Sequence, residues 1–382
     1  MVRKLIRITT VPISLDKLID GQLSFMVGNN FEVIGISSGG DKLVEVGHKE
    51  GVRVVPIEMT RKITPIKDIK AVFKLYKLLK REKPLIVHTH TPKAGIVGML
   101  ASYLAKVPNR LHTVAGLPLL EATGVKRKVL NFVEKLTYSC ATKVYPNSFG
   151  LKKIIVDNKL SKSDKLKVIA NGSSNGIDTS YFNPTLFLES TKQKLKEDLN
   201  IFENDFVFIF VGRVVADKGV NELVAAFEML SKETESIKLL IVGPFEEELD
   251  PLNEKTKALI KANKKIISVG YQNDVRLYFS ISDALVFPSY REGFPNVVLQ
   301  AGAMNLPSIV SNINGCNEII EENINGYIIP VKNEVALYNA MGSLIKDDKM
   351  KLNAREMITS RFEQKVVWEA LLDEYKILDN NV

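Results

Sequence analysis

Hydrophobic and polar positions alternate along this chain in two recurring patterns. Short apolar runs rich in Val, Ile and Phe, such as Phe206–Val211, are typical of buried strands in a parallel sheet. Longer segments with apolar residues at helical spacing lie between them, so the alternation predicts βαβ units throughout. The predicted strands are Leu5–Thr9, Glu32–Ser37, Val52–Ile57, Leu85–Thr89, Arg110–Val114, Lys143–Pro146, Lys167–Ala170, Phe206–Val211, Lys238–Val242, Ile266–Val269, Ala284–Phe287, Ser308–Val310 and Gly326–Ile329.

Helices are predicted between these strands. Their ranges are Ile66–Arg81, Ala94–Ala105, Lys126–Ser139, Val220–Lys232, Asp250–Ala262, Asp274–Ser280 and Phe294–Ala303. The segment Asn171–Pro184, rich in Asn, Gly and Ser, predicts a linker between two such series. Because 382 residues favour two domains, we expect an α/β protein with two doubly wound, Rossmann-like domains, 1–185 and 186–364. Ligands of such sheets bind at the carboxyl ends of the strands.

Candidate chemistry appears at the carboxyl end of the strand predicted over Phe206–Val211. Gly212 permits a tight turn, Arg213 and Lys218 are cations, and a helix is predicted to begin near Val220. Backbone N–H groups, a helix dipole and fixed cations together suit a diphosphate. The alternative is that the two cations are ordinary surface residues after a turn.

A second helix start follows about eighty residues later, in Glu292–Gln300. Pro295 suits the first turn of a helix, so the amides of Phe294–Val297 can face an anion. Glu292 adds a carboxylate, which can bind hydroxyl groups or can simply stabilise its own helix. The two helix starts together predict a site for a nucleotide diphosphate joined to a polyhydroxylated group.

These two stretches, their spacing and the segment Asn175–Asp178 resemble retaining GT-B glycosyltransferases, and within that fold the large family 4. The resemblance extends over nearly the whole chain. It implies a cleft between the two domains, with a nucleotide-sugar donor bound by the second domain and the acceptor on the side of the first. It also implies that the C-terminal helix, 365–382, packs back on the first domain. The alternative is a terminal helix on the second domain.

The resemblance implies roles for individual residues of the second domain. Arg213 and Lys218 match the cations that stabilise the departing diphosphate, and Glu292 matches the first glutamate of the E-x7-E motif, which contacts the donor sugar. Gln300 departs from this motif, because the family has a glutamate there that binds the ribose. A Gln keeps one acceptor and gains two donors, so a ribose contact remains feasible. The other implied donor-site residues are Gly212, Gly270, Tyr271, Phe294, Pro295, Asn296 and Val297.

The acceptor side is implied to lie on two loops of the first domain. His88–Gly95 and His112–Gly124 each begin in a predicted strand and run into a loop. Many family members carry a His where this chain has Ala115, so another residue must take its place. The acceptor-side candidates are His90, Gly116 and Glu121. The alternative for the histidines is burial in the core.

Composition narrows the classes of function. A hydrophobic fraction of 45% and a charged fraction of 25% are ordinary for a soluble globular protein. The two cysteines lie far apart, which fits a reducing cytosol. No run approaches the ~20 apolar residues that a membrane-spanning helix needs, and the first residues lack the apolar core of a signal peptide. Neither zinc-type Cys/His spacing nor a DxD pair after a strand occurs, so no metal and no other cofactor is expected.

Charge is distributed unevenly along the chain. Residues 1–200 hold 33 Lys and Arg against 17 Asp and Glu, a net charge of +16, and residues 201–382 have a net charge of −8. The basic half predicts an anionic partner, either lipid headgroups or a phosphorylated acceptor, although both halves could simply carry solvated faces. Nucleic acid is not expected, because no basic stretch interleaves aromatic residues.

The excess of positive charge in the first half is clearest in the segment Ile66–Arg81. Its apolar stripe is expected to pack on the sheet, while its lysines face anionic lipid, each contributing about 1 kcal/mol near the surface. The stripe consists of Ile66, Ile69, Val72, Phe73, Tyr76 and Leu79.

We therefore expect a retaining glycosyltransferase that moves an N-acetylhexosamine or related sugar from UDP to a polyprenyl-diphosphate-linked saccharide. Its expected place is the inner face of the cytoplasmic membrane, in the assembly of capsule, O-antigen or another glycan. One alternative is GDP-mannose or another donor with a soluble acceptor. A second is a non-hydrolysing UDP-sugar epimerase, and a third is a binding module without turnover.

Overall fold

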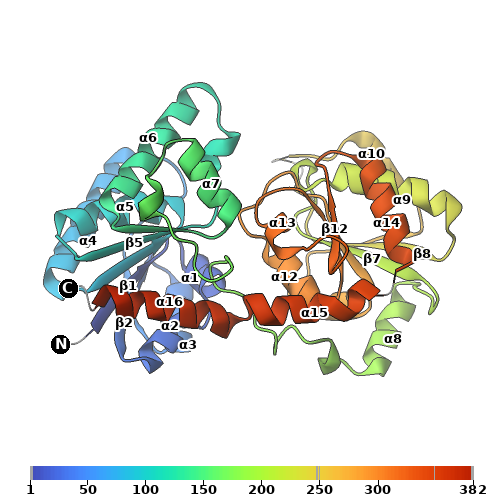
Figure 1. Cartoon of the computed structure of the whole chain (residues 1–382), viewed down its shortest axis with the longest axis horizontal. Coiled ribbons are helices and arrows are strands. Elements are labelled where there is room, and N and C mark those ends of the chain that lie inside the picture. Colours follow the sequence, from blue (N-terminus) through green and yellow to red (C-terminus); the bar gives the residue numbers. More distant parts are fainter. Residues whose placement is uncertain (1–2, 247, 249, 348, 380–382) are drawn as a thin grey trace. The chain divides into compact units, whose positions relative to one another are not determined.

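The computed structural model describes residues 3–246, 248, 250–347 and 349–379 (Figure 1). The chain forms two compact units. Unit 1 comprises Met1–Asn175 and Gln364–Val382, and unit 2 comprises Gly176–Glu363. The boundary predicted at residue 185 falls about ten residues inside unit 2.

Unit 1 is built on a six-stranded sheet with the order β3-β2-β1-β4-β5-β6, in which all pairs are parallel. The central strand β1 pairs Leu5 with Val33 of β2 on one side and with Ile86 of β4 on the other. The strand order reverses between β1 and β4, which is where doubly wound sheets bind ligands. The strands are β1 Arg3–Ile8, β2 Phe31–Ser37, β3 Arg53–Pro56, β4 Ile86–His90, β5 Asn109–Val114 and β6 Lys143–Pro146.

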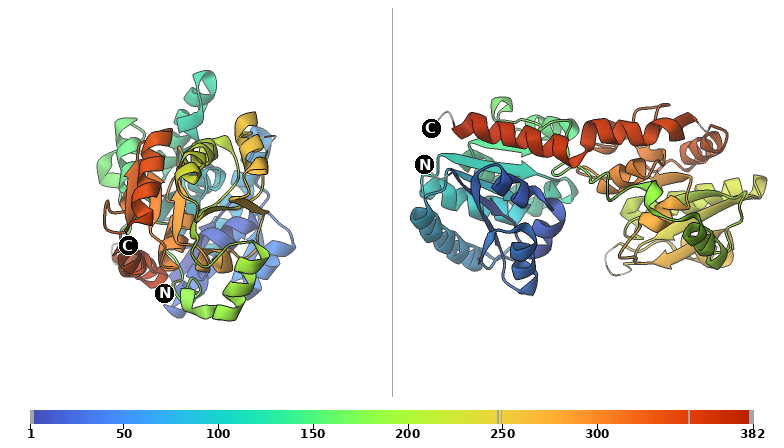
Figure 2. Two further views of the ribbon diagram at one scale, coloured as in Figure 1. Left: turned by 90° about the vertical axis from the view of Figure 1, so that its right-hand side faces the viewer. Right: turned by 90° about the horizontal axis from the view of Figure 1, so that it is seen from below.

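Helices cover both faces of this sheet (Figure 2). One face packs on α1, α2, α3 and α16, and the other on α4, α5, α6 and α7. Each apolar face is buried because strands of a parallel sheet alternate their side chains between two covered layers. The helices are α1 Pro12–Leu18, α2 Gln22–Gly28, α3 Asp41–Glu50, α4 Pro65–Glu82, α5 Pro92–Leu104, α6 Gly124–Cys140, α7 Phe149–Asp157 and α16 Gln364–Asp379.

The strand predicted over Lys167–Ala170 is wrong. The chain makes only a single bridge there, between Leu166 and Val144, and then turns away. Ala170 has a φ of +49°, which an extended strand does not allow. The apolar residues that suggested a strand therefore lie in an irregular segment. Its Lys167 forms an ion pair with the Glu374 carboxylate of α16.

The C-terminal helix predicted over 365–382 is α16, which begins at Gln364 and belongs to unit 1; residues 380–382 lie outside the described part of the chain. α15 (Lys349–Phe362) belongs to unit 2 and α16 to unit 1, and the chain passes between the units at Glu363. Within unit 1, α16 buries Leu371 and Tyr375 against the sheet, and the Tyr375 ring meets Phe31 of β2 edge-on at 5.9 Å. The Tyr375 hydroxyl lies 2.6 Å from Nδ1 of His88.

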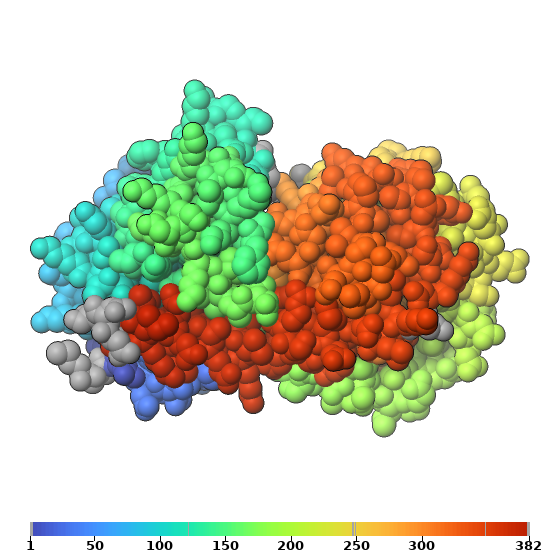
Figure 3. Space-filling view, viewed as in Figure 1, coloured from blue at the N-terminus to red at the C-terminus, as the bar shows by residue number. Residues whose placement is uncertain are grey.

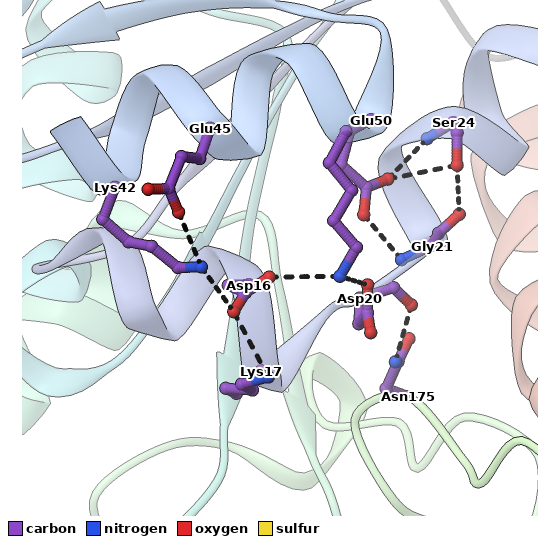
Figure 4. Close-up of polar contacts among 10 residues, drawn as sticks. Asp16, Lys17, Asp20, Gly21, Ser24, Lys42, Glu45, Glu50 and Asn175 are labelled. Carbon is purple, nitrogen blue, oxygen red and sulfur yellow. Dashed lines mark hydrogen bonds and ion pairs between the residues drawn. The ribbon is translucent and has the colours of Figure 1, made fainter. Parts of the chain in front are cut away.

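A buried carboxylate fixes α2 in place (Figure 4). Glu50, at the end of α3, accepts hydrogen bonds from the backbone N–H groups of Gly21 at 2.7 Å and Ser24 at 3.0 Å. These are amides that the start of a helix leaves without a partner. Asn175, the last residue of unit 1 before the chain leaves it, donates to the Asp20 carbonyl at 2.9 Å. The chain is therefore held beside the start of α2 just before it passes from unit 1 into unit 2.

Unit 2 has the same architecture as unit 1. Its six parallel strands have the order β12-β11-β10-β7-β8-β9, so the order reverses between β7 and β10. The strands are β7 Phe206–Val211, β8 Ile237–Val242, β9 Ile266–Gly270, β10 Ala284–Phe287, β11 Ser308–Ser311 and β12 Gly326–Ile329. The helices are α8 Glu189–Asp198, α9 Val220–Glu233, α10 Glu254–Ala262, α11 Arg276–Ser280, α12 Asn296–Ala303, α13 Cys316–Ile319, α14 Glu334–Ile345 and α15.

Candidate active site

Two loops of unit 2 come together where the strand order reverses. One follows β7 and the other follows β10, and the N–H of Tyr290 donates to the Asp217 carbonyl at 2.9 Å. The approach is so close that a Cβ atom on Gly219 would lie 2.1 Å from the Pro288 carbonyl oxygen, and Gly219 has a φ of +71°. Glycine is required here for both reasons. This edge of the sheet is where a ligand is expected in a doubly wound fold.

The loops bring Lys218 and Glu292 into direct contact. Lys218 ends a short 3-10 turn, η4 (Ala216–Lys218), and its Nζ donates to Oε1 of Glu292 at 2.5 Å. Both side chains are mostly covered, with exposed fractions of 15% and 17%. Ser289, which is fully buried, donates its hydroxyl to the same carboxylate oxygen at 3.0 Å. The sequence predicted both charged residues, and the structure places them in one site.

A third loop, which follows β11, fixes the backbone of Glu292. The side-chain amide of Asn314 donates to the Glu292 carbonyl at 2.5 Å and to the Gly293 carbonyl at 3.3 Å. Gly315 then passes so close that a Cβ there would lie 2.5 Å from the Gly293 oxygen. Sequence reasoning missed both Asn314 and Ser289. The Asn-Gly dipeptide after β11 is a turn signal that points to Asn314, whereas no local signal marks Ser289.

Arg213 has a different partner. Its Nη1 donates to Oε2 of Glu246 at 3.0 Å, and its side chain is 44% exposed. Gly212, beside it, lies under Gly243, because a Cβ on Gly243 would be 1.7 Å from the Gly212 carbonyl oxygen. In this structure the Arg213 guanidinium thus lies on the β8 side of the loop, paired with an acid rather than with Glu292.

Helix α12 begins at Asn296, two residues later than predicted. Pro295 is the residue before the helix rather than part of its first turn, and the N–H of Val298 bonds to the Pro295 carbonyl at 3.1 Å. Phe294 is buried and packs its ring on Phe362 at 5.5 Å, so it belongs to the core. No side chain caps α12, which leaves the amides of Asn296 and Val297 at its start.

The remaining donor-side residues come from separate elements. Gly270 ends β9 with a φ of +65°, and its carbonyl accepts from the N–H of Gly243 at 2.8 Å. Tyr271 follows with 69% of its surface exposed. Gln300 lies half-buried one turn after Asn296 on α12.

In unit 1 the structure buries the histidine predicted for the acceptor side. His90 is 3% exposed, and its Nε2 accepts from Nη2 of Arg7 at 2.9 Å, so the hydrogen of the neutral ring is on Nδ1. Burial, then the nearby Arg7 charge, holds the pKa of His90 well below its usual value. Gly116 is half-buried, and the Glu121 side chain lies outside the described residues.

A small cavity adjoins His90 at the carboxyl edge of β4, β5 and β6. Its volume of about 20 Å³ is enough for roughly one water molecule. His88, Thr113 and Asn147 contribute polar atoms to its wall. Both ring nitrogens of His88 have partners: Nδ1 contacts the Tyr375 hydroxyl, and the Thr113 hydroxyl lies 2.7 Å from Nε2. Burial lowers the pKa of His88 as well.

Metal ligands do not gather in the part of the chain that the structure describes. No group of three or more His, Cys, Asp or Glu side chains there is arranged to hold a metal ion. The expectation that turnover needs no metal stays a prediction.

Comparison with known proteins decides the family. A family model described as glycosyl transferases group 1 matches residues 191–361, and one described as glycosyl transferase 4-like matches residues 22–148. The capsular polysaccharide biosynthesis glycosyltransferase CapM of Staphylococcus aureus is 32% identical over 98% of this chain and 97% of its own length. This chain belongs to the family 4 glycosyltransferases of the GT-B fold.

A further relative agrees with that assignment, and a solved structure shares the fold. A UDP-Gal:alpha-D-GlcNAc-diphosphoundecaprenol alpha-1,3-galactosyltransferase of Escherichia coli is 33% identical over 80% of this chain and 78% of its own length. The crystal structure of a glycosyltransferase from Rickettsia africae superposes with a TM-score of 0.82 at 22% identity, covering 99% of both chains. The fold and enzyme class predicted from the sequence are therefore confirmed for this glycosyltransferase.

Proposed function

We propose that this glycosyltransferase transfers an N-acetylhexosamine or related sugar from a UDP-sugar to a polyprenyl-diphosphate-linked saccharide, with retention at the anomeric carbon. The observation that carries the proposal is the contact between Lys218 and Glu292 at the strand-order reversal of unit 2, beside the uncapped start of α12. The relatives support the choice of substrates, since the E. coli enzyme carries a UDP-sugar and a diphosphoundecaprenol acceptor in its name.

Charge explains how such a site would work. When the sugar leaves, the diphosphate gains negative charge, and cations and amides already in place lower the barrier. Lys218 would bind that diphosphate together with the amides of Asn296 and Val297. Freed from Lys218, the Glu292 carboxylate would accept from hydroxyls of the donor sugar. Arg213 would have to leave Glu246 to contribute its charge.

The rest of the donor would extend along the same edge. Gln300, one turn into α12, would bind the ribose, and the backbone at Gly270 and Tyr271 would meet the base. The acceptor would approach from the carboxyl edge of the unit 1 sheet. Because that acceptor is lipid-linked, the protein would act as a peripheral protein at the inner face of the cytoplasmic membrane, in the assembly of a cell-surface polysaccharide. No helix among the described residues is long and apolar enough to cross a bilayer.

Nucleotide release separates this proposal from its rivals. The purified protein is incubated with UDP- and GDP-sugars, with and without an undecaprenyl-diphosphate-linked saccharide, and free nucleotide is measured. We expect UDP release that depends on the lipid-linked acceptor, and a product that keeps the anomeric configuration of the donor. Release without acceptor, together with an altered sugar, would indicate an epimerase. Turnover of GDP-sugars alone would overturn the choice of donor.

A further inference from the structure

Thr91, which connects β4 to α5, has a backbone conformation that is rare for a threonine. Its φ is +75° and its ψ is 145°, close to a region that glycine occupies almost alone. Among the described non-glycine residues with positive φ, Thr91 alone has a branched Cβ, which makes a positive φ especially unfavourable. Strain of this kind persists only where surrounding contacts enforce it, so the contacts of Thr91 show what the strain maintains.

The side chain of Thr91 is bound to the end of β1. Its Oγ1 accepts from the backbone N–H of Thr10 at 3.2 Å and lies 2.7 Å from the Thr10 hydroxyl. Thr10 is 3% exposed, so water competes little for these bonds. A glycine at position 91 would adopt this φ without strain but would have no hydroxyl for Thr10. The strained threonine thus supplies a contact between the loops after β4 and β1 that a glycine would not.

These contacts lie at the carboxyl edge of the unit 1 sheet. The Thr10 carbonyl accepts from the N–H of Ser38, which follows β2, at 3.3 Å. The Thr91 carbonyl accepts from the N–H of Gly95 at 2.8 Å and so begins α5. Thr91 is therefore part of a continuous set of hydrogen bonds across the ends of β2, β1 and β4. The strand order reverses between β1 and β4, which is where a doubly wound sheet binds its ligand.

We propose that Thr91 is a positioning residue for the acceptor. Its strained backbone and its bonds to Thr10 hold the loops after β1 and β4 in one conformation, and the lipid-linked saccharide binds to that conformation. Thr91 acts through these loops, because its hydroxyl is already bound to Thr10. Loops that are ordered before the acceptor arrives lower its KM, because less of the binding energy is used to order them. The inference rests on the proposed function, which brings the acceptor to this edge of unit 1.

Acceptor kinetics test this role. The rate of UDP release is measured against the concentration of an undecaprenyl-diphosphate-linked saccharide that the native protein uses. Thr91→Ala removes the hydroxyl, so the binding conformation should become less populated by a few-fold to tenfold, and the acceptor KM should rise by the same factor. The kcat should be unchanged, because a saturating acceptor orders the loops before the chemical step. Thr91→Ser keeps the hydroxyl and should have the native KM.

The two threonines should act as a unit. Thr10→Val keeps the shape of the side chain and removes its hydroxyl, so it should also raise the acceptor KM. The variant with both Thr10→Val and Thr91→Ala should raise the KM by less than the product of the two single effects, because both changes remove the same bond. Independent effects would contradict the proposal, since they would show that Thr10 and Thr91 influence acceptor binding separately.

Melting temperature separates the strain from the binding role. In a helix or strand, glycine lowers stability relative to alanine. Thr91→Gly relieves the strain that Thr91→Ala keeps, so it should have the higher melting temperature, and a lower one would contradict the strain. Its acceptor KM should still be raised, because the hydroxyl is absent.

The matched control is Lys159→Gly. Lys159 is an exposed residue just after α7, and its φ of +52° is also positive. The segment that follows α7, in green, lies at the surface of unit 1 in Figure 3. Lys159→Gly should leave the acceptor KM unchanged whatever it does to the melting temperature. A raised KM in this control would mean that any change at a left-handed residue affects acceptor binding, and would contradict a specific role for Thr91.

The kinetic experiment distinguishes failure of this inference from failure of the proposed function. UDP affinity is measured on Thr91→Ala and Thr10→Val, and native affinity shows that both variants are folded. If the native protein releases UDP with the lipid-linked acceptor and either variant leaves the acceptor KM unchanged, the positioning role is wrong and the proposed function stands. If the native protein shows no acceptor-dependent release of UDP, the proposed function fails and this inference fails with it.

Discussion

The Nζ atom of Lys218 lies 2.5 Å from Oε1 of Glu292, and both side chains are more than four-fifths covered. Two opposite charges taken this far from water depend on each other. Breaking a fully buried pair costs roughly 3–5 kcal/mol, and this pair keeps some contact with solvent, so its loss should cost less. The pair also means that Lys218 already has a partner before any ligand binds. A diphosphate therefore has to compete with Glu292 for Lys218.

A double-mutant cycle tests that mutual dependence. Lys218→Ala and Glu292→Ala should each lower the free energy of unfolding, and the double variant should lower it by less than the sum of the two. We expect a coupling of about 0.5–3 kcal/mol in urea unfolding without nucleotide. Additive effects would mean that the contact contributes nothing to the free protein. Saturating UDP should reduce the coupling if the diphosphate replaces Glu292 on Lys218.

Gly219 should be irreplaceable for a steric reason. Gly219→Ala would place a Cβ 2.1 Å from the Pro288 oxygen, so the two site loops must separate. The matched control is Gly51→Ala, which has a similar φ of +65° but no atom within 4 Å of the added Cβ. The control should lose only the ~1–2 kcal/mol of a left-handed residue. Gly219→Ala should lose more in urea unfolding and should also bind UDP less tightly. Equal losses would contradict the close approach.

Substitutions of Gln300 distinguish a contact with the ribose from a role in helix packing. Gln300→Ala should lose a partly buried hydrogen bond of about 0.5–1.5 kcal/mol, which is a few-fold to tenfold in UDP affinity. Gln300→Glu should bind UDP at least as well as the native protein, because an ionised acceptor makes the stronger bond. UDP affinity and melting temperature are measured on both variants. If affinity is unchanged in both, Gln300 does not hold the ribose.

The buried histidines should make unit 1 sensitive to acid. Burial lowers the pKa of His88 and His90 well below normal and that of His112 to about 4, so the folded protein binds fewer protons than the unfolded chain. Stability is therefore complete above the unfolded pKa of about 6.5 and is lost as pH falls below it, by about 1.4 kcal/mol per pH unit for each ring. Urea unfolding at pH 7.5 and pH 5 measures the slope. His112→Asn should make the slope shallower, because it removes one of these buried rings. A slope that His112→Asn leaves unchanged would contradict this account.

The sheets were largely predictable because their strands are continuous apolar runs. β7, β10 and β12 have the bounds that the sequence predicts, since a strand covered on both faces needs apolar residues at every position. Lys218 and Glu292 were predictable because each follows such a strand. Contacts set by the shape of a loop or by packing between elements were not predictable. Ser289 reaches Glu292 only through the fold of the loop that they share, and the burial of His90 depends on α2 and α16 packing over β4.

The sequence also did not predict where some helices begin or which face of a helix packs on the sheet. α10 begins at Glu254 rather than Asp250, because the Asn253 side chain accepts from the Thr256 N–H at 2.7 Å and starts the helix there. Asp250 is used instead to accept from the Asp217 N–H at 2.6 Å. α4 shows the second limit. Of the stripe predicted to pack on the sheet, Leu79 is buried and Val72 and Tyr76 pack against the core. Ile66, Ile69 and Phe73 are exposed, and Ala71, Leu75 and Leu78 are buried in their place.

The central claim is that Lys218 acts on the diphosphate of a UDP-sugar during transfer to a lipid-linked acceptor. The most direct test is the acceptor-dependent rate of UDP release by Lys218→Ala, measured well below its melting temperature. Lys232→Ala, an exposed cation at the end of α9, is the matched control. We expect Lys218→Ala to lower kcat by about 10²-fold or more, the scale of one lost transition-state contact, and Lys232→Ala to leave it unchanged. Full kcat in a folded Lys218→Ala protein would contradict the account.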